Sequence, residues 1–234
     1  MESPEVSVVV PAWNEARRLP RLLDALAACR PGPAEVVVAD GGSEDGTRAI
    51  ASERARLVEA PRGRARQQNA GAAATHGDTL WFLHADCEPP PWAVGEIAAA
   101  LGTGAAGGCF LMAFPEPERR RRPLLRVVQA GINARTRATR TGTGDQGIFV
   151  RREVFGRVGG FPDWPLFEDV ALFSALAAAG APAICHGPLT TSARRWMEGG
   201  VARTMVRMWS LRIGYWAGVS PARLARSWRH EPHG

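Results

Sequence analysis

One stretch near the start of the chain decides its fold: VSVVVPAWNEARRLPRLLDALAAC, residues 6–29. Its first five residues are mostly β-branched, which favours a buried strand. After Pro11, leucines recur at spacings of three and four, the pattern of a helix with one buried face. They are Leu19, Leu22, Leu23 and Leu26. The stretch therefore predicts a strand, a polar loop and an amphipathic helix.

The same unit recurs along the chain. We expect further strands at residues 36–38, 57–59 and 80–83, and helices at residues 45–55 and 63–74. Strands that alternate with helices are typical of a parallel sheet flanked by helices. The later pattern predicts a helix ending at 101, a strand at 108–114, an exposed loop at 116–122, a helix at 124–137, a glycine-rich loop at 141–147, a strand at 148–150, a helix at 168–179 and a strand at 183–185.

No internal repeat or linker divides the 234 residues. We therefore expect a single α/β domain over residues 1–234, with a mostly parallel central sheet and a helical C-terminal extension.

The composition favours anionic partners and a reducing compartment. All 29 basic residues are arginines and the net charge is +6, which suits nucleotides, phosphates or a lipid surface. No nucleic-acid-binding motif accompanies this charge, so we expect no nucleic acid partner. The four cysteines lie far apart without a C-x-x-C pair, which argues against a zinc site and a disulfide scaffold. Residues 1–5 lack the features of a signal peptide, so we expect a cytoplasmic protein.

Polar loops follow three of the predicted strands, at residues 11–15, 40–43 and 84–86. In open sheets ligands bind at the carboxyl ends of strands, so we expect these loops to converge on one site. Asp86 is placed to hold Mg²⁺ or Mn²⁺ between the protein and a diphosphate. An aspartate that caps the helix beginning near residue 90 explains the same position.

Two other acidic motifs also allow two interpretations. In Asp40-Gly41-Gly42 the backbone can approach a ligand closely while Asp40 accepts hydrogen bonds from a base or ribose. A tight turn with Ser43 or Asp45 at a helix N-terminus accounts for the same residues.

Glu168 and Asp169 begin a predicted helix, where free N–H groups stabilise carboxylates. One of them could deprotonate an acceptor hydroxyl as a general base, or both could simply cap the helix.

Five blocks in order resemble family-2 glycosyltransferases of the GT-A fold: VSVVVPAWNE (6–15), DGGSEDGT (40–47), NAG (69–71), GDTLWFLHAD (77–86) and FED (167–169). The resemblance implies an inverting glycosyltransferase that uses a nucleotide diphosphate sugar, with a UDP-sugar favoured, and a hydroxyl acceptor. It implies a nucleotide-binding half at about residues 1–115, an acceptor and base half at about 116–190, and a helical segment at about 191–234.

The resemblance also implies roles for single residues. Asp169 would be the base, with Glu168 beside it, and Asp86 would bind Mg²⁺ or Mn²⁺. The donor nucleotide would contact Pro11, Ala12, Glu15, Asp40, Gly41, Gly42, Asn69, His84 and Ala85. Arg64 and Arg66 are candidates for stabilising the departing diphosphate.

The chain departs from the family pattern at two positions. Gly41 stands where the family often has a second acid, which leaves the base of the donor open. The metal motif is His84-Ala85-Asp86 instead of Asp-x-Asp, so one carboxylate and one imidazole take its place.

A closer resemblance is to a small bacterial subgroup named for association with arsenosugar biosynthesis. It depends on LHAD (83–86), GDQG (144–147) and TSARRW (191–196). Asp145 and Gln146 would bind the sugar or the acceptor, or shape a turn, and Trp164 lies in a loop that could close over substrate. His186 follows the last predicted strand, where some GT-A enzymes place another metal ligand, although a packed or exposed histidine also fits.

The C-terminal stretch has amphipathic character. Val201, Met205, Met208, Trp209 and Trp216 share a helical face opposite Arg203 and Arg207, and we expect this face to pack in the core. Arg212 falls within it, which would suit a buried ion pair, a homodimer contact or peripheral attachment to the inner membrane face. The acceptor would be a small molecule or a lipid-linked one.

Two other functions share parts of this pattern. A sugar-phosphate nucleotidyltransferase has a similar sheet and uses a metal ion in a similar way. A non-catalytic nucleotide-binding module would explain the altered metal motif. The adjacent acids Glu168 and Asp169 favour an enzyme over the second alternative.

Overall fold

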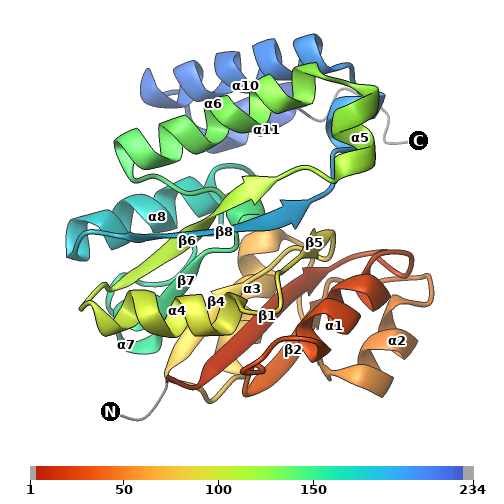
Figure 1. The fold of residues 1–234 in the computed structure, drawn as a ribbon, viewed down its shortest axis with the longest axis vertical. Coiled ribbons are helices and arrows are strands. Elements are labelled where there is room, and N and C mark those ends of the chain that lie inside the picture. The colour runs from red at the N-terminus through yellow and green to blue at the C-terminus, as the bar shows by residue number, and fades with distance from the viewer. Residues whose placement is uncertain (1–3, 229–234) are drawn as a thin grey trace.

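A mixed eight-stranded sheet forms the centre of the computed structural model, which describes residues 4–228 (Figure 1). Its strand order is β3-β2-β1-β4-β7-β6-β8-β5. The strands are β1 (Val6–Ala12), β2 (Glu35–Asp40), β3 (Arg56–Glu59), β4 (Thr79–Phe82), β5 (Cys87–Glu88), β6 (Gly107–Ala113), β7 (Phe149–Arg151) and β8 (Ala183–Thr191). The pairs β1–β2, β1–β4, β2–β3 and β6–β8 are parallel, and β4–β7, β6–β7 and β5–β8 are antiparallel. This confirms a mostly parallel sheet.

Helices flank the sheet and form most of the C-terminal part. They are α1 (Leu19–Ala27), α2 (Thr47–Arg54), α3 (Arg64–Ala73), α4 (Ala93–Gly102), α5 (Glu116–Arg121), α6 (Leu124–Thr139), α7 (Arg152–Arg157), α8 (Glu168–Ala179), α9 (Arg194–Glu198), α10 (Val201–Trp216) and α11 (Pro221–Trp228), with a 3₁₀ turn η1 (Gly144–Gln146). Among the described helices none has the length and apolar character needed to cross a bilayer. Figure 1 shows α6, α10 and α11 gathered at one end of the longest axis, away from the N-terminus.

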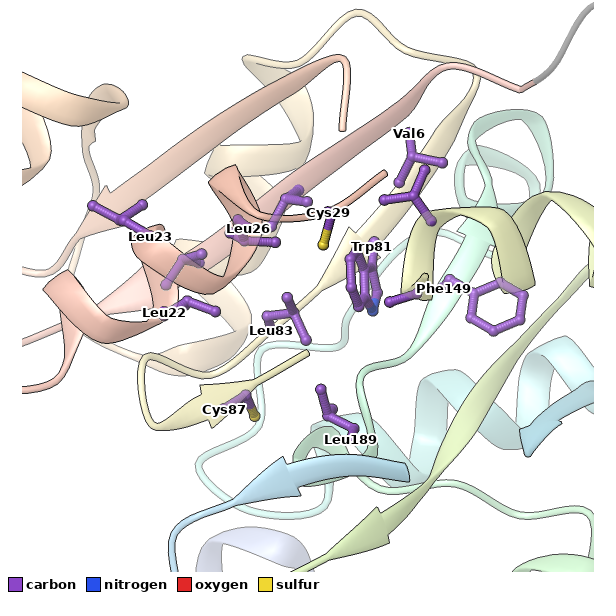
Figure 2. Packing of buried hydrophobic residues seen from close by; sticks show 14 of the residues in the cluster. Val6, Leu22, Leu23, Leu26, Cys29, Trp81, Leu83, Cys87, Phe149 and Leu189 are labelled. Carbon is purple, nitrogen blue, oxygen red and sulfur yellow. The ribbon is translucent and has the colours of Figure 1, made fainter. Parts of the chain in front are cut away.

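Apolar side chains that alternate between the two faces of the central strands form a hydrophobic core on each face of the sheet. Trp81 and Leu83 belong to one buried cluster, and their neighbours Leu80 and Phe82 belong to the other. Successive side chains of a strand point to opposite faces, so one buried strand supports both cores. The leucines of α1 join the first cluster, and Figure 2 shows Leu22, Leu26 and Cys29 gathered near Trp81 and Leu83: the predicted amphipathic helix covers this face of the sheet.

The four cysteines are free and buried. Burial also raises the pKa of the Cys109 thiol to about 12. At neutral pH this group stays protonated and behaves as a small apolar side chain.

The prediction of an exposed loop at residues 116–122 is wrong, because residues 116–121 form helix α5. The segment begins with acids and ends with arginines, which complements the helix dipole. Glu116 pairs with Arg119 and Arg120 one turn later. Charge pairs at these spacings stabilise a short helix even when no apolar face is buried. The segment does lie at the surface, as its polarity indicates.

The last strand of the sheet is longer than predicted. Strand β8 continues from Ala183 to Thr191 instead of ending at 185, and its far end pairs with β5. Gly187 and Pro188 obscure the strand pattern in this stretch. Pairing with distant segments, β6 and β5, supplies the hydrogen bonds that local propensity does not predict.

The predicted buried face of α10 is right only at its start, where Val201 is buried and Met205 packs against the core. Its buried residues are Val201, Thr204 and Leu211, whereas Trp209 and Trp216 are 54% and 65% exposed. A helical wheel groups residues by their hydrophobicity, but the neighbouring elements decide which face is covered. Here that face contacts α6, α9 and α11.

Candidate active site

Three aspartates from three separate segments gather around His84 and Arg64. They are Asp86, Asp145 and Asp169. Each of these carboxylates interacts electrostatically with both the Arg64 guanidinium and the His84 imidazole. Desolvation lowers the pKa of His84, and Arg64 lowers it further, while the three carboxylates oppose the shift. His84 is therefore neutral at neutral pH. The structure thus brings together the metal-motif, GDQG and FED segments that lie far apart in sequence.

The end of β4 positions His84 and Asp86. The Leu83 N–H donates to the Val9 carbonyl, which keeps the chain extended beyond the strand, and the Cys87 N–H donates to the His84 carbonyl to close a turn. Asp86 lies half-buried in this turn. The N-cap of α4 is Trp92, and no side chain makes a capping hydrogen bond there. The alternative that Asp86 caps this helix is therefore wrong.

Asp169 is held in place by backbone N–H groups. Its Oδ2 accepts a hydrogen bond of 2.7 Å from the Gly144 N–H, and its Oδ1 accepts one of 2.7 Å from the Val170 N–H. The carboxylate also lies in the first turn of α8, where the helix dipole favours negative charge. These contacts orient the carboxylate and link helix α8 to the η1 turn.

Gly144 separates Asp169 from His84. A Cβ atom on this residue would lie 2.8 Å from His84 Nε2 and 3.4 Å from Asp169 Oδ2. The first distance is shorter than side chains tolerate, so a larger residue at this position would require the His84 ring to shift. The imidazole and the carboxylate therefore face the same small space.

We expect Gly144→Ala to lower kcat by roughly ten-fold to a hundred-fold, because a displacement of about 1 Å at a catalytic group costs that much. The fold should persist, since the added methyl group displaces only the His84 ring and the η1 turn. Steady-state kinetics and a thermal melt would test this together. Gly131→Ala is a matched control, because a Cβ atom there meets open space. Unchanged kcat in Gly144→Ala would show that this spacing does not matter.

Glu168 and Arg64 form an ion pair in which the carboxylate is far more deeply buried than the guanidinium. Arg64 Nε lies 3.0 Å from Glu168 Oε1, and their side chains are 43% and 3% exposed. The second oxygen of Glu168 is buried without a hydrogen-bond partner. Burial raises the pKa of Glu168, Arg64 lowers it in part, and Asp169 raises it again. The positive charge of Arg64 is shared among several carboxylates. It therefore does not fully offset the cost of burying the Glu168 carboxylate, which is the most deeply buried of them.

The raised pKa of Glu168 makes a pH-dependent contribution to stability. Its contribution to the free energy of unfolding is full below the ordinary carboxyl pKa and is lost as the pH rises through the raised value. We therefore expect Glu168→Gln to melt a few degrees above the wild type at neutral pH, with the difference closing in acid. Thermal melts across this pH range would test it. A variant that melts below the wild type at neutral pH would mean that the Arg64 pair outweighs burial.

A cleft of about 380 Å³ lies between the start of α3 and the segment before α8. Arg64 and Arg66 line one side, and Trp164 and Glu168 line the other. Arg66 pairs with Asp163 at 2.7 Å across this cleft. The structure therefore places both predicted arginines and Trp164 at one opening, with Arg64 nearest the aspartates.

The Asp40 loop does not join this cluster. Asp40 is 1% exposed, and its carboxylate accepts hydrogen bonds of 3.0 Å from the Gly42 and Ser43 N–H groups and one from the Ser43 hydroxyl. Gly42 has a φ of +85°, which favours glycine. The structure thus shows the tight turn of the second alternative, but the N-cap of α2 is Gly46, not Ser43 or Asp45. The carboxylate of Asp40 is therefore enclosed by its own loop, apart from Asp86, Asp145 and Asp169, and its contact with the donor nucleotide stays a prediction.

Gln67 explains why residue 41 is a glycine instead of the second acid that the family pattern implies. The sequence patterns did not predict this role of Gln67. Its buried amide donates to the Ala12 and Ala39 carbonyls at 2.7 and 2.9 Å, so it joins the ends of β1 and β2. A Cβ atom at Gly41 would lie 3.0 Å from this amide. The space beside Gly41, where the family resemblance implies a second acid, is therefore filled from α3, a contact that no local pattern indicates.

A second missed feature is a cation–π pair at the edge of these loops. The Arg62 guanidinium lies 3.5 Å from the centre of the Trp13 ring, which is 41% exposed. Glu15 lies nearby in sequence and pairs with Arg18. These residues form the outer rim of the loop that follows β1.

Several residues that were predicted to bind the donor or the sugar are buried or form hydrogen bonds with the backbone of other segments. The Asn69 amide donates to the Phe161 carbonyl and accepts from its N–H, at 2.8 and 3.0 Å. The fully buried Gln146 donates to the Phe110 carbonyl and accepts from the Thr143 N–H. Pro11, Ala12 and Ala85 are buried. Asn69 and Gln146 therefore hold the site's segments in position.

Of the two interpretations of His186, the structure shows the exposed histidine and not a metal ligand. His186 is exposed on β8, beside Gly187, whose N–H donates to Glu96 of α4. Thr191, which pairs with Cys87 next to Asp86, lies five residues further along the strand, a separation of about 16 Å. Continuation of β8 as a strand carries His186 away from the aspartates.

Arginines from the C-terminal helices reach the site, which sequence analysis did not predict. Arg195 of α9 interacts electrostatically with Asp145 and Asp86, and Arg212 of α10 with Asp169 and Asp145. Desolvation lowers the pKa of both. Tyr215, one turn after Arg212, stacks on Phe167 with ring centres 4.8 Å apart. Helix α10 thus covers the start of α8, and Arg212 lies within electrostatic reach of Asp169 and Asp145.

The aspartates fit a cation that is shared with a substrate. No group of three or more His, Cys, Asp or Glu side chains within residues 4–228 forms a complete metal cage. Mg²⁺ in particular needs only one or two protein carboxylates when phosphate oxygens and water supply the rest. Asp86, with His84 beside it, offers that incomplete set, so the residues fit such a cation and do not fit a separate structural metal.

Comparison with known proteins identifies relatives of this chain. The sequence model of the family described as "Glycosyl transferase family 2" matches residues 7–159. Glycosyltransferase AglE of Haloferax volcanii is 29% identical over 177 residues, which cover 68% of this chain and 57% of AglE. The chain therefore spans little more than half the length of this curated relative.

Solved structures share the fold. S. aureus TarS 1-349 in complex with UDP has a TM-score of 0.64 and 17% identity, covering 80% of this chain and 60% of that one. Mannosyltransferase PcManGT from Pyrobaculum calidifontis, in complex with GDP-Man and Mn²⁺, has a TM-score of 0.60 and 26% identity, covering 82% and 57%. Glucosyl-3-phosphoglycerate synthase from Mycobacterium tuberculosis, with Mn²⁺, UDP and phosphoglyceric acid, has a TM-score of 0.55 and 25% identity, covering 80% and 70%.

Proposed function

The chain belongs to glycosyl transferase family 2, and from this premise we propose that it transfers a sugar from a nucleotide diphosphate sugar to a hydroxyl acceptor with inversion at the anomeric carbon. A UDP-sugar is the favoured donor. The observation that carries the proposal is the Asp169 carboxylate, which Gly144 and Val170 orient beside His84 and close to Arg64.

Asp169 is proposed as the general base. A base must hold its lone pair toward the hydroxyl proton, and two backbone N–H groups fix this carboxylate in one orientation. The proton passes from the acceptor hydroxyl to Asp169 while the hydroxyl oxygen attacks the anomeric carbon and the bond to the diphosphate breaks. Glu168 is less suited to this role, because one of its oxygens is paired with Arg64 and burial favours its protonated form.

The leaving diphosphate is proposed to lie near Arg64 and Asp86. Arg64 stands within electrostatic reach of both Asp86 and Asp169, so it can neutralise charge that develops on the leaving group without moving. A divalent cation held by Asp86, Mg²⁺ or Mn²⁺, would supply further neutralisation when bound. Complexes of PcManGT and of glucosyl-3-phosphoglycerate synthase with Mn²⁺ support this assignment.

The nucleoside is proposed to bind across the loops after β1 and β2, beside Trp13, Glu15 and the Gly42 turn. Residues at about 1–115 would then bind the nucleotide and residues at about 116–190 the acceptor and base. Asp145 and Trp164 would contact the sugar or acceptor, because one lies among the aspartates and the other lines the cleft.

Calorimetry with UDP, GDP, dTDP and ADP, each with Mn²⁺, tests the donor class. We expect one diphosphate to bind, with UDP tightest, and the corresponding nucleotide sugar to be hydrolysed slowly without an acceptor. No binding by any of the four would contradict the proposal. Release of pyrophosphate from a nucleoside triphosphate and a sugar phosphate would instead identify a nucleotidyltransferase.

A further inference from the structure

Two helices at one end of the molecule present apolar stripes to solvent. On α10 the stripe consists of Val206, Trp209, Ile213 and Trp216, each more than half exposed. Their spacings of three and four residues place them on one face. On α6, Leu124 and Val127 are exposed and are followed at the same spacings by exposed Gly131, Ala134 and Ala138.

The two stripes belong to one end of the fold. Helices α6 and α10 contact each other, and Figure 1 shows them side by side at one end of the longest axis. Soluble proteins expose single apolar residues freely, but rows of large ones usually mark an interaction surface. We call the exposed faces of α6 and α10 the apolar end surface.

The positive charge of the chain is concentrated in the C-terminal elements that include these two helices, although Arg195 and Arg212 among them interact with the active-site carboxylates. Fifteen of the 29 arginines, but only three of the 23 acidic residues, fall within residues 116–140 and 194–228. The rest of the chain has more acids than arginines. Arg119 to Arg122 directly precede α6, and Arg203 lies exposed one turn before the α10 stripe. Apolar side chains and cationic groups therefore occur together on these helices.

We propose that the apolar end surface docks on an anionic lipid bilayer. A helix with large apolar residues on one face and arginines at its flanks lies in the plane of the membrane interface, where tryptophan side chains are favoured. A second copy of the chain could also cover the stripes. However, such a dimer would bring two arginine-rich ends together, and like charges oppose association. Anionic headgroups complement both features.

Docking would place the active site beside the membrane. Tyr215 of α10 contacts Phe167, which precedes the Glu168-Asp169 pair, and Arg212 interacts electrostatically with Asp169. If the function proposed above holds, the acceptor hydroxyl is therefore carried by a lipid-linked molecule. Bilayer docking itself does not depend on that function.

Vesicle flotation tests the docking. The full chain is mixed with vesicles of phosphatidylcholine, with or without phosphatidylglycerol. We expect flotation only with phosphatidylglycerol, weakened by added salt because screening reduces the attraction. The double variant Trp209→Ser with Trp216→Ser should lower the partition by about ten-fold or more. Trp92→Ser is the matched control, since Trp92 and Trp209 are both 54% exposed and Trp92 lies at the N-cap of α4, outside the apolar end surface.

A variant with reversed charges tests the contribution of the arginines to docking. Arg121→Glu with Arg203→Glu should weaken flotation by at least about five-fold for each arginine replaced. Arg17→Glu, at an exposed arginine in the loop before α1, should leave it unchanged. Circular dichroism and a thermal melt would confirm that every variant is folded.

Two outcomes would overturn the docking proposal. One is wild-type protein that does not float with phosphatidylglycerol, or floats equally after the tryptophan and arginine changes. The other is a dimer, seen by sedimentation equilibrium, that the tryptophan variant dissociates. UDP binding with Mn²⁺ is measured separately in solution, so failure of docking and failure of the proposed transferase function remain distinguishable.

Discussion

Replacing Asp169 by asparagine is expected to lower kcat by about 10²-fold to 10⁴-fold, the usual contribution of a general base. Asparagine keeps the shape of the side chain and can still accept the Gly144 N–H bond, so the η1 turn and helix α8 should stay in place. The base acts in the transition state, so donor affinity should be nearly unchanged. Steady-state kinetics together with calorimetry of the nucleoside diphosphate and Mn²⁺ would measure both quantities.

A control separates this effect from a general charge change. Asp24→Asn removes an exposed aspartate of α1 that pairs with Arg54, far from the cluster in sequence and on a different element. It should leave kcat unchanged. If Asp169→Asn turned over at the wild-type rate, Asp169 would not be the base and the proposed mechanism would fail.

Replacing Asp86 by asparagine is expected to abolish metal-dependent donor binding. Because a catalytic cation contributes several kcal/mol, kcat/KM should fall by roughly 10²-fold to 10³-fold. Asp86 caps no helix, and the cap of α4 involves no side-chain bond, so the thermal stability should change little. Calorimetry of UDP with and without Mn²⁺ would show whether the metal dependence disappears.

The two aspartate variants should differ in one respect. Asp169→Asn loses turnover and keeps donor binding, whereas Asp86→Asn loses both. Metal dependence that survived in Asp86→Asn would place the cation on other residues, with Asp145 as the next candidate because it lies in the same cluster. Equal loss of donor binding in both variants would mean that Asp169 also contacts the donor.

Local patterns were sufficient for most of the sheet. Runs of β-branched residues predicted β1 and β2, and the leucine spacing predicted α1, because strand and helix periodicities act over a few neighbouring residues. The same reasoning failed for short elements. Residues 116–121 have no apolar period, and β5 has two residues, so neither offers a pattern long enough to detect.

The candidate site was predictable only in part. Asp86 follows a buried strand and Asp169 begins a helix, and both are positions where a carboxylate stands out in the sequence. Their partners were not predictable in this way. The Gly144 bond to Asp169 joins residues 25 positions apart, and the arginines of α9 and α10 reach the site through the packing of the C-terminal part.

By itself, then, the sequence determined the order of the longer strands and helices, which follows from neighbours along the chain, and it singled out two aspartates whose proposed roles come from the family resemblance. Tertiary structure alone decided that Asp40 turns into its own loop, that Gln67 fills the space at Gly41, and that Trp209 and Trp216 face solvent. The physical reason is the same in each case. Hydrogen bonding and burial depend on which distant segments meet, and the periodicity of a single segment contains no information about its partner.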